Sequence, residues 1–160
     1  MLLHPHRVYT SPFEVTAGEL AGLGVRALLL DIDGTIARTC EPEPAPAVVQ
    51  WARGLTAQGI SLFILSNNKH PLRVQRFGEM LGCGYMYRAG KPRRRGFEQA
   101  LRVLGCAPGQ AALLGDQIFT DVLGARRCGL KALRVESTDT QLWYYGLRRF
   151  FETPFLGPRE

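Results

Sequence analysis

The hydrophobic positions of the chain fall into short apolar runs separated by longer stretches of mixed polarity. The short runs predict buried strands, and the longer stretches predict helices. Glycines at positions 59, 82, 105 and 129 mark the ends of helices. We expect strands over residues 27–30, 60–65, 85–87, 111–114 and 130–135, and helices over residues 47–58, 71–81, 93–104, 118–128 and 140–152.

This alternation of strands and helices predicts the fold class. Parallel strands need crossover connections, and right-handed crossovers through helices produce a three-layer α/β sandwich. We therefore expect one α/β domain over residues 1–160, built on a parallel five-stranded sheet. Residues 1–24 are expected to form an irregular lead-in with a short helical turn over residues 14–20, and residues 139–160 to form a C-terminal helix and tail.

The predicted C-terminal helix is amphipathic, and two interpretations of its apolar face stay open. The face is formed by Trp143, Tyr144, Leu147, Phe150 and Phe151. It either packs on the sheet as the last helix of the sandwich or, with Phe155 and Leu156 beyond it, contacts a membrane or a second subunit.

Composition and charge restrict the partner and the compartment. The formal net charge is +6, which favours an anionic partner such as a phosphate ester, a nucleic acid or an anionic lipid. The four cysteines include no C-x-x-C pair, so we expect reduced thiols in a cytoplasmic protein rather than a zinc ribbon. The N-terminus lacks the apolar core of a signal peptide, and every apolar run is too short to cross a bilayer.

Two aspartates follow the first predicted strand, at the edge where parallel α/β sheets bind their ligands. Asp31 and Asp33 are two positions apart, so both carboxylates face the same side of an extended chain. A carboxylate can attack phosphorus as a covalent nucleophile. Asp33 is placed to protonate the leaving alkoxide and then to deprotonate water, and Gly34 lets the backbone turn away. The competing interpretation is an Asp-rich turn at a strand end.

Candidate phosphate ligands follow the second and third predicted strands. The hydroxyl of Ser66 and free backbone N–H groups near Asn67 can bind a phosphoryl oxygen, although Ser and Asn also cap helices. The Lys91 ammonium suits a phosphate, although a loop lysine is usually solvated. Residues 93–95, all arginine, place cations in a first helical turn, which is consistent with anion binding or with a solvated basic face.

A second acidic cluster follows the fourth predicted strand. Mg²⁺ prefers oxygen ligands, and the sequence offers the carboxylates of Asp31, Asp116 and Asp121 with the backbone carbonyl of Asp33. Such a metal would allow carboxylates and an anionic substrate to lie close together, and it would stabilise charge during phosphoryl transfer. The alternative is that Asp116 or Asp121 caps the next helix.

Together these motifs resemble the haloacid dehalogenase superfamily. The resemblance rests on residues 31–35 (Asp-Ile-Asp-Gly-Thr), on Ser66, on Lys91, and on residues 115–116 (Gly-Asp) with Asp121. It implies an aspartyl-phosphate intermediate on Asp31, Asp33 as general acid/base, phosphate binding by Ser66 and Lys91, and Mg²⁺ held by Asp116 and Asp121. An aspartate at position 33 resembles the phosphatases of the superfamily rather than its transport ATPases or dehalogenases.

A narrower resemblance, to the YqeG-type subfamily of class IIIA, covers nearly the whole chain. It rests on residues 66–68, on Lys91-Pro92 with Gly96-Phe97, and on residues 115–124 (Gly-Asp-Gln-Ile-Phe-Thr-Asp-Val-Leu-Gly). That group includes mitochondrial phosphatidylglycerophosphate phosphatases, so the resemblance implies this lipid as a substrate. Gly34 departs from the asparagine that the group often carries at this position.

The spacing of the motifs leaves no room for a cap domain. Between Asp33 and Ser66, and between Ser66 and Lys91, only the predicted elements fit. An open site suits a phosphate carried on something large. We therefore expect a phosphorylated substrate, favour an anionic phospholipid met by peripheral membrane contact, and do not expect a nucleic acid.

Other functions stay open at this point. The alternatives are a phosphatase for a protein, nucleotide or sugar phosphate, and a binding or assembly factor that has lost turnover. The sequence does not indicate an oligomeric state.

Overall fold

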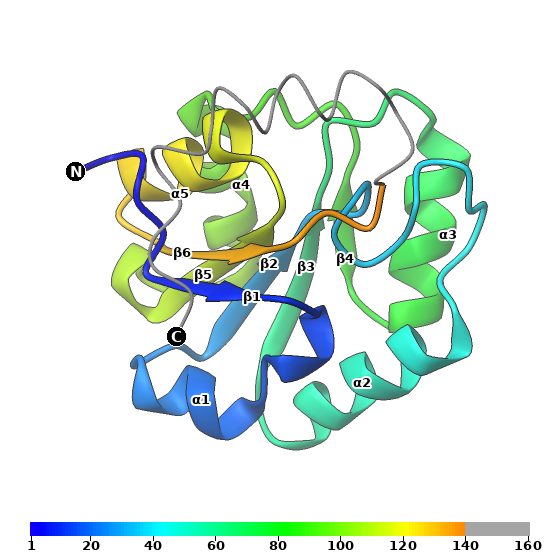
Figure 1. Ribbon diagram of the computed structural model, residues 1–160, viewed down its shortest axis with the longest axis horizontal. Coiled ribbons are helices and arrows are strands. Elements are labelled where there is room, and N and C mark those ends of the chain that lie inside the picture. Colours follow the sequence, from blue (N-terminus) through cyan, green and yellow to red (C-terminus); the bar gives the residue numbers. More distant parts are fainter. Residues whose placement is uncertain (140–160) are drawn as a thin grey trace.

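The computed structural model describes residues 1–139, and these residues form the expected three-layer α/β sandwich (Figure 1). A parallel sheet lies between two layers of helices, with the strand order β1-β6-β5-β2-β3-β4. Every pair of neighbouring strands in the sheet is parallel. The strands are β1 (Arg7–Tyr9), β2 (Ala27–Leu30), β3 (Ser61–Leu65), β4 (Gly84–Met86), β5 (Ala111–Gly115) and β6 (Lys131–Val135).

Within residues 1–139 the sheet has six strands, so the prediction of five was wrong by one. The additional strand is β1, which lies in the segment expected to be an irregular lead-in. It pairs with β6 at the edge of the sheet, with Arg7 opposite Leu133 and Tyr9 opposite Val135. Three residues carry too little periodicity to be recognised as a strand, and the partner strand lies at the other end of the described chain.

Helices cover both faces of the sheet. The helices α1 (Ala17–Gly22), α2 (Pro46–Ala57) and α3 (Pro71–Leu81) pack on one face, and α4 (Arg94–Leu104) and α5 (Leu123–Arg127) pack on the other (Figure 1). Short 3₁₀ turns occur at Pro12–Glu14 and Pro108–Gln110. Each face of the sheet has its own hydrophobic core. Along β2 the side chains alternate, so that Leu28 and Leu30 pack in the core under α1, α2 and α3, and Leu29 packs in the core under α4 and α5.

The helix predicted over residues 118–128 is present but begins with an unusual turn. Residues Ile118–Val122 form a π-helical turn, and α5 continues from it. Such turns are frequent at functional sites. The helix predicted over residues 140–152 lies outside the described residues.

Backbone hydrogen bonds extend the sheet pairing beyond the strand ends. The Asp31 N–H donates to the Leu114 carbonyl at 3.0 Å, and the Ser66 N–H donates to the Met86 carbonyl at 2.9 Å. Both residues therefore stand at the carboxyl edge of the sheet.

No separate module covers this edge within residues 1–139. From Asp33 to Lys91 the chain forms only α2, β3, α3 and β4 with their loops. In the same part of the chain, none of the helices combines the length and apolar character needed to cross a membrane.

Candidate active site

Lys91 joins two buried aspartates at the carboxyl edge of the sheet. Its Nζ atom lies 2.9 Å from Asp31 Oδ1 and 2.7 Å from Asp121 Oδ1. The three side chains are at most 7% exposed. Because buried charges need partners and hydrogen bonds to persist, this lysine is a structural part of the site and not a solvated loop residue.

Burial and neighbouring charges act on both sides of this ion pair. Burial raises the pKa of the Asp31 carboxyl well above its ordinary value, Lys91 opposes that shift, and Asp121 and Asp116 add to it. Burial alone lowers the pKa of Lys91, but the carboxylates of Asp121 and Asp31 more than reverse this, so its pKa is raised. The ammonium therefore stays charged, and a further cation would favour ionised Asp31.

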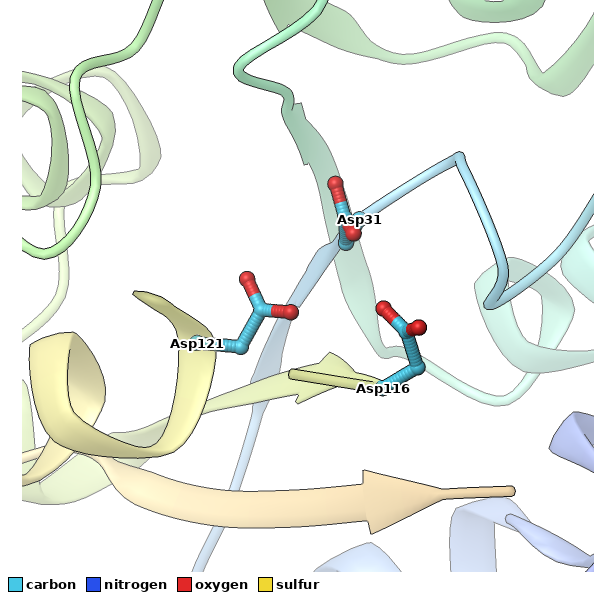
Figure 2. A group of neighbouring side chains, drawn as sticks. All are labelled: Asp31, Asp116 and Asp121. Carbon is cyan, nitrogen blue, oxygen red and sulfur yellow. The ribbon is translucent and has the colours of Figure 1, made fainter. Parts of the chain in front are cut away.

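Three carboxylates converge in this cluster from three different segments. Asp31 follows β2, Asp116 follows β5, and Asp121 lies in the π-helical turn, with their side chains directed toward one another (Figure 2). Each is buried and offers an oxygen within 4.8 Å of the others. Lys91 supplies one positive charge against three carboxylates, and such oxygens are the ligands that hard divalent cations prefer. The triad can hold a divalent metal.

Two glycines make room for these carboxylates. A Cβ atom on Gly34, whose φ is +78°, would lie 2.6 Å from Asp116 Oδ2 and 2.8 Å from Ser137 Oγ. A Cβ atom on Gly115 would collide with the Asp121 carboxylate. The acidic groups therefore pack against bare backbone, and this close approach accounts for glycine at both positions.

Asp33 lies in the same site but is turned away from the acidic triad. Its Oδ1 atom is 2.8 Å from Arg73 Nη1, and its Oδ2 atom accepts a hydrogen bond of 2.8 Å from Asn68 Nδ2. Its carboxylate is not among the three that converge. A metal contact through the Asp33 backbone carbonyl stays a prediction.

The loop after β3 supports Lys91. The Asn67 side chain accepts a 2.9 Å hydrogen bond from the Lys91 N–H and donates one of 3.0 Å to the Lys91 carbonyl. Ser66 is fully buried, and its Oγ accepts from the Asn68 N–H at 3.1 Å in a local turn. It does not cap α3, whose N-cap is His70. Phosphate binding by Ser66 and Asn67 stays a prediction.

A cavity of about 220 Å³ opens over these residues. It is lined by Asp31, Asp33, Thr39, Asn67, Asn68, Lys91, Gln117 and Thr120. Three of these lining residues were not predicted as site residues from the sequence: Thr39, Gln117 and Thr120. Gln117 and Thr120 belong to the Gly-Asp-Gln motif at residues 115–124, so this motif could have indicated them as site residues.

No sequence motif indicates Thr39, because its position depends on Asp139, which is 100 residues away in the sequence. Its N–H donates to both carboxylate oxygens of Asp139, at 3.1 and 3.0 Å, and its hydroxyl also bonds Asp139. The neighbouring Thr138 N–H donates to the Gly34 carbonyl at 3.0 Å. The segment after β6 thus holds the loop that follows Asp31.

The comparison with protein families agrees with this fold and site. Residues 11–129 match the model of the haloacid dehalogenase-like hydrolases, and the chain belongs to this family. It is 31% identical over 131 residues to the probable phosphatase YqeG of Bacillus subtilis, covering 82% of this chain and 76% of that protein. With the acidic site, this relationship identifies the chain as a phosphatase and confirms the YqeG-type resemblance.

Shorter alignments and solved structures are consistent with the assignment. Over 48 residues the chain is 46% identical to the human phospholysine phosphohistidine inorganic pyrophosphate phosphatase, covering 30% of this chain and 18% of that protein. The cobalt-bound deoxy-D-mannose-octulosonate 8-phosphate phosphatase of Haemophilus influenzae superposes with a TM-score of 0.58, at 13% identity, over 82% of this chain and 89% of that chain. A hydrolase of subfamily IIIA from Legionella pneumophila gives 0.53, at 21% identity, over 72% and 69%. These structures support the fold.

Proposed function

We propose that the protein is a Mg²⁺-dependent phosphomonoester hydrolase that works through an aspartyl-phosphate on Asp31. One observation carries the proposal: Asp31 pairs with buried Lys91 at 2.9 Å, in a cavity that Asp33 also lines. A nucleophile, a fixed cation for the phosphoryl group and a second carboxylate for proton transfer are thus within one small site.

The reaction has two half-steps. Asp31 attacks phosphorus, an Asp31 O–P bond forms, the P–O bond to the leaving group breaks, and Asp33 gives its proton to the leaving oxygen. Water then attacks phosphorus while Asp33 takes its proton, and the Asp31 O–P bond breaks to release phosphate. The Lys91 ammonium balances charge near Asp31 in both half-steps.

The acidic triad fits a hard divalent cation. Asp31, Asp116 and Asp121 would hold it, and all three offer buried carboxylate oxygens. A bound Mg²⁺ supplies charge neutralisation for the approach of an anionic phosphate to anionic carboxylates. The cobalt-bound form of the Haemophilus influenzae phosphatase supports a divalent metal in this fold.

The substrate we propose is a phosphate presented on a large or membrane-borne molecule, with phosphatidylglycerophosphate favoured by the YqeG-type relationship. Within residues 1–139 the loops after β3 and β4 carry exposed cations. The Arg88 N–H donates to the carbonyl of Asn68, a cavity residue, at 3.0 Å, and this bond joins the two loops beside the cavity. Each cation near an anionic membrane adds about 1 kcal/mol of attraction. These cations are Lys69, Arg88 and Arg93.

The chemistry is tested with a generic aryl phosphate. We expect hydrolysis that requires added Mg²⁺, stops in excess chelator and is abolished by Asp31→Asn. Turnover that persists in the variant, or without any divalent ion, contradicts the mechanism. Acid quenching of wild type with labelled substrate should trap phosphate on the protein, and Asp31→Asn should trap none.

The substrate class is tested separately. Phosphatidylglycerophosphate in vesicles is compared with a nucleotide monophosphate, a sugar phosphate and a phosphopeptide by kcat/KM. We expect the lipid to lead by at least about tenfold, and vesicle binding to fall as salt rises. A clear preference for a soluble substrate overturns the lipid assignment while leaving the phosphatase chemistry intact.

A further inference from the structure

Arg73 makes an unusually complete set of contacts for an arginine near the surface. Its Nη1 atom lies 2.8 Å from Asp33 Oδ1, its Nε donates to the Glu41 carbonyl at 2.8 Å, and its Nη2 donates to the Arg38 carbonyl at 3.1 Å. The guanidinium also lies over the Phe77 ring, 5.1 Å from its centroid. Nε and Nη2 thus each donate a hydrogen bond, Nη1 makes an ion-pair contact without hydrogen-bond geometry, and the side chain is 12% exposed.

These contacts link three segments that are separate in sequence. Arg73 stands in the first turn of α3, Asp33 follows β2, and residues 38–41 form the loop beyond it. A planar guanidinium presents several donors in fixed directions, so it can hold a carboxylate and two carbonyls at once. A lysine ammonium, a single charged point, cannot reproduce that arrangement.

The orientation of Asp33 depends on this arginine. Its two carboxylate oxygens are anchored separately, one by Arg73 and the other by Asn68 at 2.8 Å. The hydrogen bond from Asn68 and the ion pair with Arg73 together restrain rotation of the carboxylate. Proton transfer requires a heavy-atom distance of about 2.6–3.2 Å, so a rotated carboxylate would miss the leaving oxygen.

We infer that Arg73 is a positioning residue for proton transfer, which holds Asp33 in the orientation needed to protonate the leaving group. The inference rests on the proposed function, because it takes Asp33 as the general acid/base. Arg73 is not itself among the residues that line the cavity or form the acidic triad, and its contact with the lining is through Asp33. Its effect on turnover therefore passes through Asp33.

Leaving-group dependence separates this role from a general structural one. A nitrophenolate leaves without protonation, whereas an alkoxide needs the proton. We expect Arg73→Gln to lower kcat for glycerol phosphate by about 10- to 100-fold, and kcat for 4-nitrophenyl phosphate by a far smaller factor. Arg73→Lys, which can still reach one oxygen of Asp33, should recover part of the loss.

A matched control is available on the same helix. Arg76 pairs with Glu43 at 2.8 Å, but both side chains are well exposed, at 60% and 46%. Arg76→Gln should leave kcat for both substrates unchanged. Thermal melts of all variants exclude unfolding as the cause of lost turnover, and the partial retention in Arg73→Lys serves the same purpose.

A double-mutant cycle completes the test. In an Asp33→Asn background, Arg73→Gln should have little further effect on glycerol phosphate turnover, because the group that it positions is gone. Equal losses on the two substrates, or a full further loss in the Asp33→Asn background, overturn the positioning role. Unchanged glycerol phosphate turnover in Asp33→Asn itself contradicts the acid/base role of Asp33, so the two failures are distinguishable.

Discussion

The Asn67 side chain forms hydrogen bonds with both backbone groups of Lys91, at 2.9 and 3.0 Å. One amide thus joins the loop after β3 to the loop after β4, and it fixes the backbone from which the Lys91 side chain reaches Asp31 and Asp121. The position of the Lys91 ammonium is therefore set by a residue in the neighbouring loop.

Asn67→Ala should weaken both stability and phosphate binding. Each lost hydrogen bond costs about 0.5–1.5 kcal/mol, so we expect a loss of about 1–3 kcal/mol in urea denaturation and a raised KM. Gln58→Ala is the control, because that exposed amide bonds only the Gly54 carbonyl. Similar losses in the two variants would contradict a specific role for Asn67.

Lys91→Met should be strongly destabilising. It leaves the buried Asp31 and Asp121 carboxylates without their ammonium, and breaking a buried ion pair on one side costs about 3–5 kcal/mol. Denaturation in chelator measures the effect, and added Mg²⁺ should recover part of it by supplying positive charge. Full stability in chelator would mean that the cluster does not depend on Lys91.

Gly34→Ala tests the close approach of backbone and acidic cluster. The added methyl would meet Asp116 Oδ2 at 2.6 Å, so we expect weaker Mg²⁺ binding by calorimetry together with lower stability. Gly24→Ala is the matched control, because Gly24 has a similar φ of +72° but open space around it. It should show only the backbone strain, about 1–2 kcal/mol, and unchanged metal affinity.

Cysteine reactivity should follow burial. Burial raises the pKa of the Cys83 thiol to about 11, whereas Cys40 is exposed. Iodoacetamide at pH 8, read by mass spectrometry, should modify Cys40 first and Cys83 only slowly. Because the pKa of Cys83 in the folded protein exceeds the ordinary thiol pKa of 9.0, the stability linked to Cys83 is present below pH 9 and is lost as pH rises through 11. Rapid modification of Cys83 at pH 8 would contradict this environment.

The fold class, and the sheet edge at which the candidate site lies, were predictable from local sequence pattern. Apolar runs mark β2, β3, β5 and β6, and each residue assigned to the site follows a strand. In a parallel sheet the carboxyl ends of the strands share one edge, so local pattern was enough to bring Asp31, Ser66, Lys91 and Asp116 together.

The side-chain pairings at that edge, and the presence of β1 at one side of the sheet, depend on the packing of the whole domain. Two contacts cannot be read from local sequence: the ion pair of Asp33 with Arg73 and the hydrogen bonds of Thr39 with Asp139. Each depends on the distance between two segments after the helices have packed. The strand β1 is likewise too short to have its own periodicity, and its pairing with β6 defines it. Periodicity is a property of neighbouring residues, whereas hydrogen bonds between distant segments are fixed by the packing of the whole domain.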